Sequence, residues 1–213
     1  MGMPVQVRRH WTAAQVRELI AAAPLASPRY ELVDGELLVT PSPNAHHQGI
    51  VFGLFARLQP YCDEQHVGVA GTSPSDVELE AERIAQPDLF VVTTNEWTRV
   101  LAEGFPLRTM LLAVEVLSPS SSRYDRVSKQ PLYMRHVPEY WIIDPDGRLI
   151  ERWRAGDARP EIVTQHLEWQ PSLSAPSLVI DLPRFFAAAL GDPVGPPPRQ
   201  APTSAGTIPL RNH

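Results

Sequence analysis

The stretch TMLLAVEVLS, residues 109–118, restricts the possible folds of this chain more than any other segment. It is almost continuously apolar, which is typical of a central strand whose sheet is covered on both faces. Glu115 is the exception within it. A buried, unpaired carboxylate is energetically expensive, so Glu115 indicates a metal ion, a catalytic role or, alternatively, a structural ion pair.

The segments around this strand predict a mixed α/β fold, with a central sheet flanked by helices. Residues 12 and 15 form a capping-box signal, and Asn44 can cap the longest helix. Asp34-Gly35 predicts the turn of a hairpin. Pro131 should kink its helix or mark a first turn. Helices are expected over 10–24, 43–65, 125–137 and 182–190, a hairpin over 30–40, and strands over 66–71, 75–81, 87–93, 109–118, 139–154 (two strands), 161–167 and 177–181.

Composition limits the function classes. The chain has 213 residues, is 43% hydrophobic and carries a net charge of −5, so nucleic-acid binding would need a local basic patch. One cysteine, Cys62, excludes an intrachain disulfide framework and a cysteine-based zinc site. Without a signal peptide or an apolar run of about 18 residues, a cytoplasmic enzyme or binding module is expected. We expect a lead-in with a helix over 1–28, the main domain over 29–190, and a disordered proline-rich tail over 191–213.

Asp88 and Glu115 are the candidate metal ligands. Asp88 starts the strand over 87–93, and 27 residues separate it from Glu115, enough for a turn and a return on the neighbouring strand. Two carboxylates at such a position could bind one Mg²⁺ or Mn²⁺ ion together with water and phosphate oxygens. A turn or strand-start role is the alternative for Asp88.

The segment after the central strand is basic. On a helix, Asp125, Lys129 and Tyr133 lie four residues apart and share one face, which could turn Lys129 back toward Glu115. An ammonium group there could orient water or stabilise phosphate charge. A solvated basic helix face is the alternative. Arg123 and Arg126 belong to the same segment and are candidates for contacts to a nucleic-acid backbone.

Six motifs, in this order and spacing, resemble the Uma family of restriction endonuclease-like proteins: YELVDGELLV, the helix start at His47, QPDLFVV, LAVEVLSPSS, the Asp125-Lys129-Tyr133 helix and PEYWIIDP. The resemblance implies the PD-(D/E)xK nuclease fold, a four-stranded mixed core sheet with helices on both sides. It also implies a Mg²⁺-type ion held by Asp88 and Glu115. The usual lysine follows the second acid by two positions, where this chain has Leu117, so the basic role is assigned to Lys129.

Several further residues are candidates with a structural alternative. His47 could serve the site or make only a local hydrogen bond, and Tyr133 could bond the acids or pack in the core. Glu36 could face the cleft or solvent, and Asp76 could assist the acids or shape a turn. Arg152 and Arg154 share one strand face, where they could contact phosphates or form an exposed hairpin surface.

Three functions are compatible with these features. The first is a Mg²⁺-dependent endonuclease acting on DNA. The second is a catalytically inactive nuclease fold that serves nucleic-acid or protein interaction, suggested by Leu117 and the acidic net charge. The third is a structural partner in a homodimer, through the EYWIID strand or the terminal helices. One site per chain would also favour a dimer for cutting duplex DNA.

Overall fold

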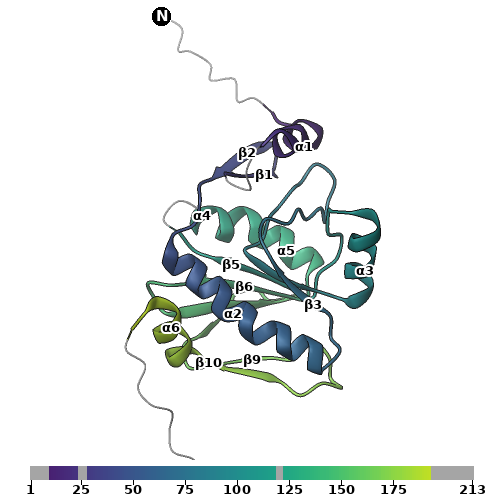
Figure 1. Cartoon of the computed structure of the whole chain (residues 1–213). Helices are drawn as coiled ribbons and strands as arrows, with labels where there is room; N and C mark the ends of the chain where they lie inside the picture. Colours follow the sequence, from purple (N-terminus) through teal and green to yellow (C-terminus); the bar gives the residue numbers. More distant parts are fainter. Residues whose placement is uncertain (1–9, 24–27, 119–121, 193–213) are drawn as a thin grey trace, which may run out of the picture.

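The computed structural model of the chain describes residues 10–23, 28–118 and 122–192. The predicted tail lies outside the described residues from residue 193 onward. The elements are arranged as a mixed α/β fold (Figure 1). Along the chain they are α1 (Ala13–Ala22), β1 (Arg29–Val33), β2 (Glu36–Thr40), α2 (Ala45–Glu64), β3 (Val69–Thr72), β4 (Leu89–Val92), α3 (Thr94–Glu103), β5 (Leu112–Val116), α4 (Ser122–Tyr124), η1 (Asp125–Lys129), α5 (Gln130–His136), β6 (Glu139–Asp144), β7 (Leu149–Arg154), β8 (Glu161–Val163), β9 (His166–Trp169), β10 (Leu178–Asp181) and α6 (Leu182–Leu190).

Within the described residues, six strands form one sheet in the order β3-β4-β5-β6-β7-β8. β5 and β6 pair in parallel, and the other neighbouring strands are antiparallel. Strands β3 to β6 form a mixed core of the size that the resemblance implied, and β7 and β8 extend it. Every residue of β5 is buried in the middle of this sheet, as its continuous apolar pattern predicted.

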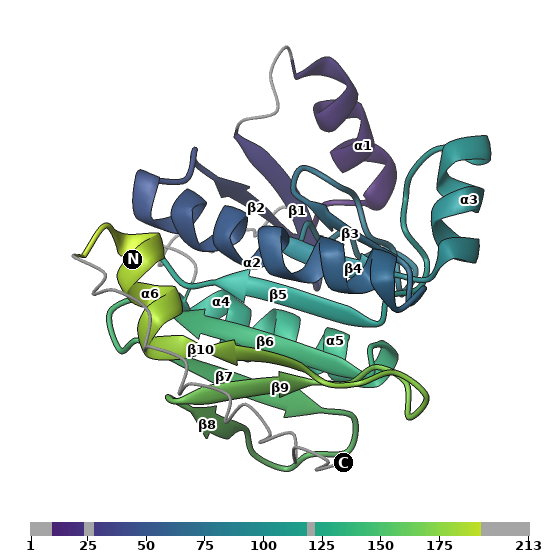
Figure 2. The same cartoon turned by 60° about the horizontal axis from the view of Figure 1, so that its bottom comes forward.

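Helices cover both faces of the sheet. Val114 of β5 shares one hydrophobic core with Leu54 of α2, and β9, β10 and α6 add side chains to the same core. Figure 2 shows that α2, α6, β9 and β10 lie on the same side of the central sheet. Ala113 shares a second core with Leu132 of α5 and with α3. Because successive side chains of a strand point to opposite faces, Glu115 lies on the Ala113 face, toward α5.

The β1–β2 hairpin forms as Asp34-Gly35 predicted, with both turn residues at positive φ. It packs against α1, whose predicted capping box is present at Thr12. Leu32 and Ile84 exchange two backbone hydrogen bonds of 2.8 and 2.9 Å, which attach β1 to the loop before β4. The hairpin thereby lies beside the start of β4 although it is not part of the central sheet.

The helix after β5 is interrupted by the π-helical turn η1. The amide of Gln130 donates to the carbonyl of Asp125, five residues earlier, and Pro131 follows in the first turn of α5. Proline has no N–H to donate to the fourth residue before it, so the break falls where Pro131 predicted a kink. Such π-helical turns frequently occur at functional sites.

The sequence-based expectation was wrong for three segments. Residues 75–81 form no strand; Val77 makes only isolated bridges to Ala85 and Leu107. The segment 161–167 is not one strand, because β8 ends at Val163 and β9 begins at His166 in a separate pair. Helix α3 was not predicted. None of the helices in the described ranges combines the length and apolar character of a membrane span.

Candidate active site

A cleft of about 600 Å³ opens where β4 begins and β5 ends. Asp88, Glu115 and Lys129 all line it, so the three residues predicted to form the site converge there. Asp88 directly precedes β4, and its neighbour Leu89 pairs with Val114, the residue before Glu115. The two acids therefore lie close to neighbouring strands, Asp88 immediately before β4 and Glu115 on β5.

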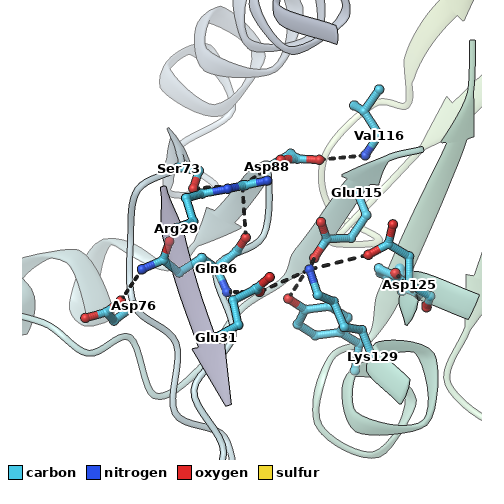
Figure 3. Close-up of polar contacts among 12 residues, drawn as sticks. Arg29, Glu31, Ser73, Asp76, Gln86, Asp88, Glu115, Val116, Asp125 and Lys129 are labelled. Carbon is cyan, nitrogen blue, oxygen red and sulfur yellow. Dashed lines mark hydrogen bonds and ion pairs between the residues drawn. The ribbon is translucent and has the colours of Figure 1, made fainter. Parts of the chain in front are cut away.

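Asp88 is 4% exposed and is held by three donors. Arg29 Nη1 donates to Asp88 Oδ1 at 2.7 Å (Figure 3). His47 Nε2 lies 3.0 Å from Oδ2, and the amide of Val116 donates to the same oxygen at 2.8 Å. The backbone of β5 thus fixes the Asp88 carboxylate directly beside Glu115.

Glu115 is 2% exposed and faces the π-helical turn. Its Oε1 atom accepts from Lys129 Nζ at 3.0 Å and from the Tyr133 hydroxyl at 3.2 Å. Lys129 and Tyr133 are four residues apart, so one helical face supplies both donors, as predicted. Tyr133 is fully buried and contacts the Tyr140 ring, so it both packs in the core and orients the acid.

Lys129 is enclosed by acids. Besides Glu115, its Nζ lies 3.0 Å from Glu31 Oε1 and 3.4 Å from Asp125 Oδ1 (Figure 3). Lysine is almost never this buried unless it is paired, and here its side chain is 4% exposed. The arrangement holds the ammonium group at one fixed place at the edge of the cleft.

A second row of hydrogen bonds fixes Glu31. Its Oε1 atom accepts from the backbone N–H of Gln86 at 2.7 Å, and the side-chain Nε2 of Gln86 donates to Asp76 Oδ1 at 2.6 Å (Figure 3). Asp76 therefore reaches the acids only through Gln86 and Glu31, and it lies outside the cleft lining.

The charges in the cluster affect one another. Burial disfavours a charged Asp88, but the His47 hydrogen bond and the Arg29 guanidinium outweigh it and hold the pKa of Asp88 below its ordinary value. Burial raises the pKa of Glu115 well above its usual value; Lys129 opposes this, while Asp125 and Asp88 add to it. Burial opposes the charge of Lys129, but its three acidic neighbours hold its pKa well above the ordinary value. Asp88 and Lys129 are thus charged, whereas Glu115 has an increased affinity for a proton or another cation.

The other candidates are divided between the site and the surface. His47 and Asp125 line the cleft, and His47 bonds Asp88 in addition to its local helix-cap bond to Asn44. Arg126 also lines the cleft and is ion-paired with Glu151. Glu36 and Arg123 are exposed and lie outside the cleft lining.

Arg152 and Arg154 do not form the exposed pair that was expected. Arg152 is buried, and its guanidinium binds the Glu139 carboxylate through contacts of 2.6 and 3.1 Å. Its charge is neutralised inside the fold, because Glu139 on the neighbouring β6 strand faces it. Arg154 is 46% exposed and pairs with Glu161 at 2.9 Å.

Sequence reasoning missed Arg29 and Glu31. They are two residues apart on β1 and therefore share one strand face, which the docked hairpin turns toward the cluster. One sequence signal was present, because Glu31 stands between Tyr30 and Leu32 in the same way that Glu115 stands between two apolar residues.

Hard-cation chemistry fits the donors in the cleft. Asp88 and Glu115 supply carboxylate oxygens, and Mg²⁺ is commonly held by one or two carboxylates plus water and substrate phosphate. Among the described residues, no group of three or more histidine, cysteine or acidic side chains is placed to hold a metal ion. Asp88 and Glu115 are the residues that could hold such an ion together with water and substrate.

Comparison with known proteins decides the family. The sequence matches the Uma2 family, described as "Putative restriction endonuclease", over residues 16–183. The chain belongs to this family. The matched region includes every cleft residue named above. Membership supports a nuclease function for this Uma2 protein. None of the curated proteins that were compared matches its sequence.

A solved structure shares the fold. It is a "putative nuclease belonging to DUF820" from Anabaena variabilis ATCC 29413, with a TM-score of 0.68 and 19% sequence identity. The similarity covers 82% of this chain and 98% of that one. It confirms the expected restriction-endonuclease-like arrangement of a mixed central sheet flanked by helices.

Proposed function

We propose that this Uma2 protein is a Mg²⁺-dependent endonuclease that hydrolyses phosphodiester bonds of DNA. The observation that carries the proposal is the convergence of Asp88, Glu115 and Lys129 in one cleft. DNA is the favoured substrate because the family is described as one of restriction endonucleases.

Asp88 and Glu115 would hold the ion. When bound, Mg²⁺ lowers the pKa of a water molecule and neutralises charge on the scissile phosphate. Burial is the main cause of the raised pKa of Glu115, with the nearby acids adding to it, and a bound cation would favour the ionised carboxylate as Lys129 does. His47 and Arg29 would keep the Asp88 carboxylate ionised and oriented.

Lys129 would position the attacking water and stabilise the charge that develops on the phosphate. Its ammonium group is fixed by Glu31 and Asp125 before substrate arrives, so little reorganisation is needed. Arg126 at the cleft would contact the DNA backbone by exchanging its Glu151 partner for a phosphate. Cutting both strands of a duplex with one site per chain would use two copies.

An inactive nuclease-fold module is the second candidate. It is favoured by the saturation of Asp88, which already accepts from Arg29, His47 and Val116. Under that alternative the protein would bind DNA in a salt-dependent way without cutting it.

A cleavage assay distinguishes the two candidate functions. Plasmid and single-stranded DNA would be incubated with wild type in Mg²⁺, in Mn²⁺ and in a chelator. The test variants are Asp88→Asn and Glu115→Gln, and the control is Glu168→Gln, an exposed acid on β9. We expect metal-dependent cleavage that falls at least about 100-fold in both test variants and is retained in the control. Cleavage by Glu115→Gln at the wild-type rate would exclude the proposed roles.

A further inference from the structure

A second cavity of about 280 Å³ adjoins the cleft on the α2 side. Arg29, His47 and Asp88 line both cavities, so the two meet at the Asp88 carboxylate. The second cavity continues between the linker before α2, the first turns of α2 and the loop after β3. A molecule bound in the cleft could therefore extend into it without leaving contact with the site.

The walls of this cavity are largely apolar, and one of them is an aromatic ring. Pro43, Val51, Phe52 and Pro74 contribute to the lining. Phe52 is 64% exposed, and within the described residues it belongs to none of the hydrophobic cores. Its ring is therefore available at the cavity rather than committed to packing.

Polar residues complete the lining: Arg29, His47 and Asp88, which the cavity shares with the cleft, together with Gln48, Thr72 and Ser73. Gln48 and Thr72 line the cavity and offer both donors and acceptors. Ser73 also lines it, and its Oγ accepts from Arg29 Nη1 at 3.0 Å, next to the bond between Arg29 and Asp88 (Figure 3). Apolar walls with a few convergent polar groups are the usual composition of a small-ligand site.

We propose that this cavity binds one unpaired nucleobase, that of a nucleotide flanking the scissile phosphate, with Phe52 stacked on the base. The inference rests on the proposed nuclease function and deepens it. The cavity volume lies just below the roughly 300–1,000 Å³ of drug-sized pockets, which is large enough for a single base. The preferred substrate is therefore single-stranded or locally opened DNA, since a base in a duplex must leave the stack to enter a pocket.

Binding without cleavage tests the proposal directly. Single-stranded oligonucleotides with the fluorescent base analogue 2-aminopurine at successive positions would be titrated with the full-length protein in chelator. We expect the analogue to be quenched most strongly at one position. Phe52→Ala should abolish that quench and weaken binding about 5- to 150-fold, the effect of losing one stacked base. Phe52→Trp should retain both the quench and the binding affinity.

Leu101→Ala is the matched control, because Leu101 is 72% exposed on α3, outside the cavity lining. Equal binding by Phe52→Ala and wild type, or an equal loss in Leu101→Ala, would overturn the base site. The outcome of the cleavage assay tests the nuclease proposal independently of the base site. If wild type cuts no DNA in metal yet shows a quench that depends on Phe52, the base site stands and hydrolysis does not.

Discussion

Lys129 Nζ lies 3.0 Å from Glu115 Oε1, although 14 residues and a change from strand to π-helical turn separate them. In the nuclease pattern that this sequence resembles, the lysine would stand at position 117, directly after β5, where this chain has Leu117. The chain thus brings an ammonium group to the second acid from the following helix.

Lys129→Met should destabilise the fold. The substitution leaves Glu31, Glu115 and Asp125 facing one another without their shared cation, and removal of one partner of a buried ion pair costs about 3–5 kcal/mol. Urea unfolding followed by circular dichroism measures the change. Adding Glu31→Gln to this variant should recover part of the loss, because one buried charge fewer remains. An unchanged unfolding midpoint in Lys129→Met would contradict the enclosed geometry.

Mg²⁺ should stabilise the folded protein without any substrate present. A ligand that binds only the folded state at ten times its dissociation constant adds about 1.4 kcal/mol, so thermal unfolding should shift upward with Mg²⁺ concentration. Asp88→Asn should lose the shift, while Glu168→Gln should keep it. If the melting temperature of wild type did not change with Mg²⁺ concentration, Asp88 and Glu115 would not be metal ligands.

The buried and exposed arginines of β7 should behave differently. Arg152→Ala leaves the buried Glu139 carboxylate without its partner and should lower the free energy of unfolding by about 3–5 kcal/mol. Arg154→Ala removes only a surface ion pair with Glu161, which contributes about 0–1 kcal/mol. Chemical denaturation of both variants provides the comparison. If both substitutions lowered the free energy of unfolding equally, the buried pair of Arg152 with Glu139 would not contribute more to stability than the surface pair of Arg154.

Glu96 should make stability depend on acid pH. Hydrogen bonds from Arg99, at 2.8 and 3.1 Å, together with the Arg108 amide, outweigh burial and hold the pKa of Glu96 below its ordinary value of 4.5. A group whose pKa is lower in the folded state stabilises the fold above its unfolded-state pKa. That contribution is lost as pH falls through the folded-state value.

Glu96→Gln removes this titration while keeping an oxygen acceptor. The difference in unfolding free energy between wild type and Glu96→Gln should therefore be largest above about pH 5 and shrink toward pH 3. Denaturation curves of both proteins across that range measure it. A difference that stays constant with pH would refute the role of the Glu96 charge.

The central residues of the candidate site could be predicted from local sequence patterns. Glu115 stood out because a charge interrupted an apolar strand, and Asp88 because it starts the strand over 87–93, which could pair with that of Glu115. Lys129 and Tyr133 followed from helical spacing. These are short-range patterns, and the sheet pairing of β4 with β5 brought them together as expected.

Glu31 stands between two apolar residues, as Glu115 does, but this local pattern did not show that Arg29 and Glu31 approach the acids. Their approach to the acids depends on the two backbone bonds between Leu32 and Ile84, which join segments about 50 residues apart and leave no periodic trace. Helix α3 is a different case, because Thr93 caps it and accepts from the amide of Glu96, a signal present in the sequence. Residues 75–81 alternate like a strand, but Val77 is held by isolated bridges instead of a ladder.

The β1–β2 hairpin has a consequence for the integrity of the site. A chain beginning at Pro41 would keep Asp88, Glu115, Lys129 and the whole central sheet. It would nevertheless lack Arg29 and Glu31, so Asp88 would lose a cation and Lys129 an anchor. In this chain, the charge network around Asp88, Glu115 and Lys129 is therefore complete only when the amino-terminal hairpin is docked against the sheet.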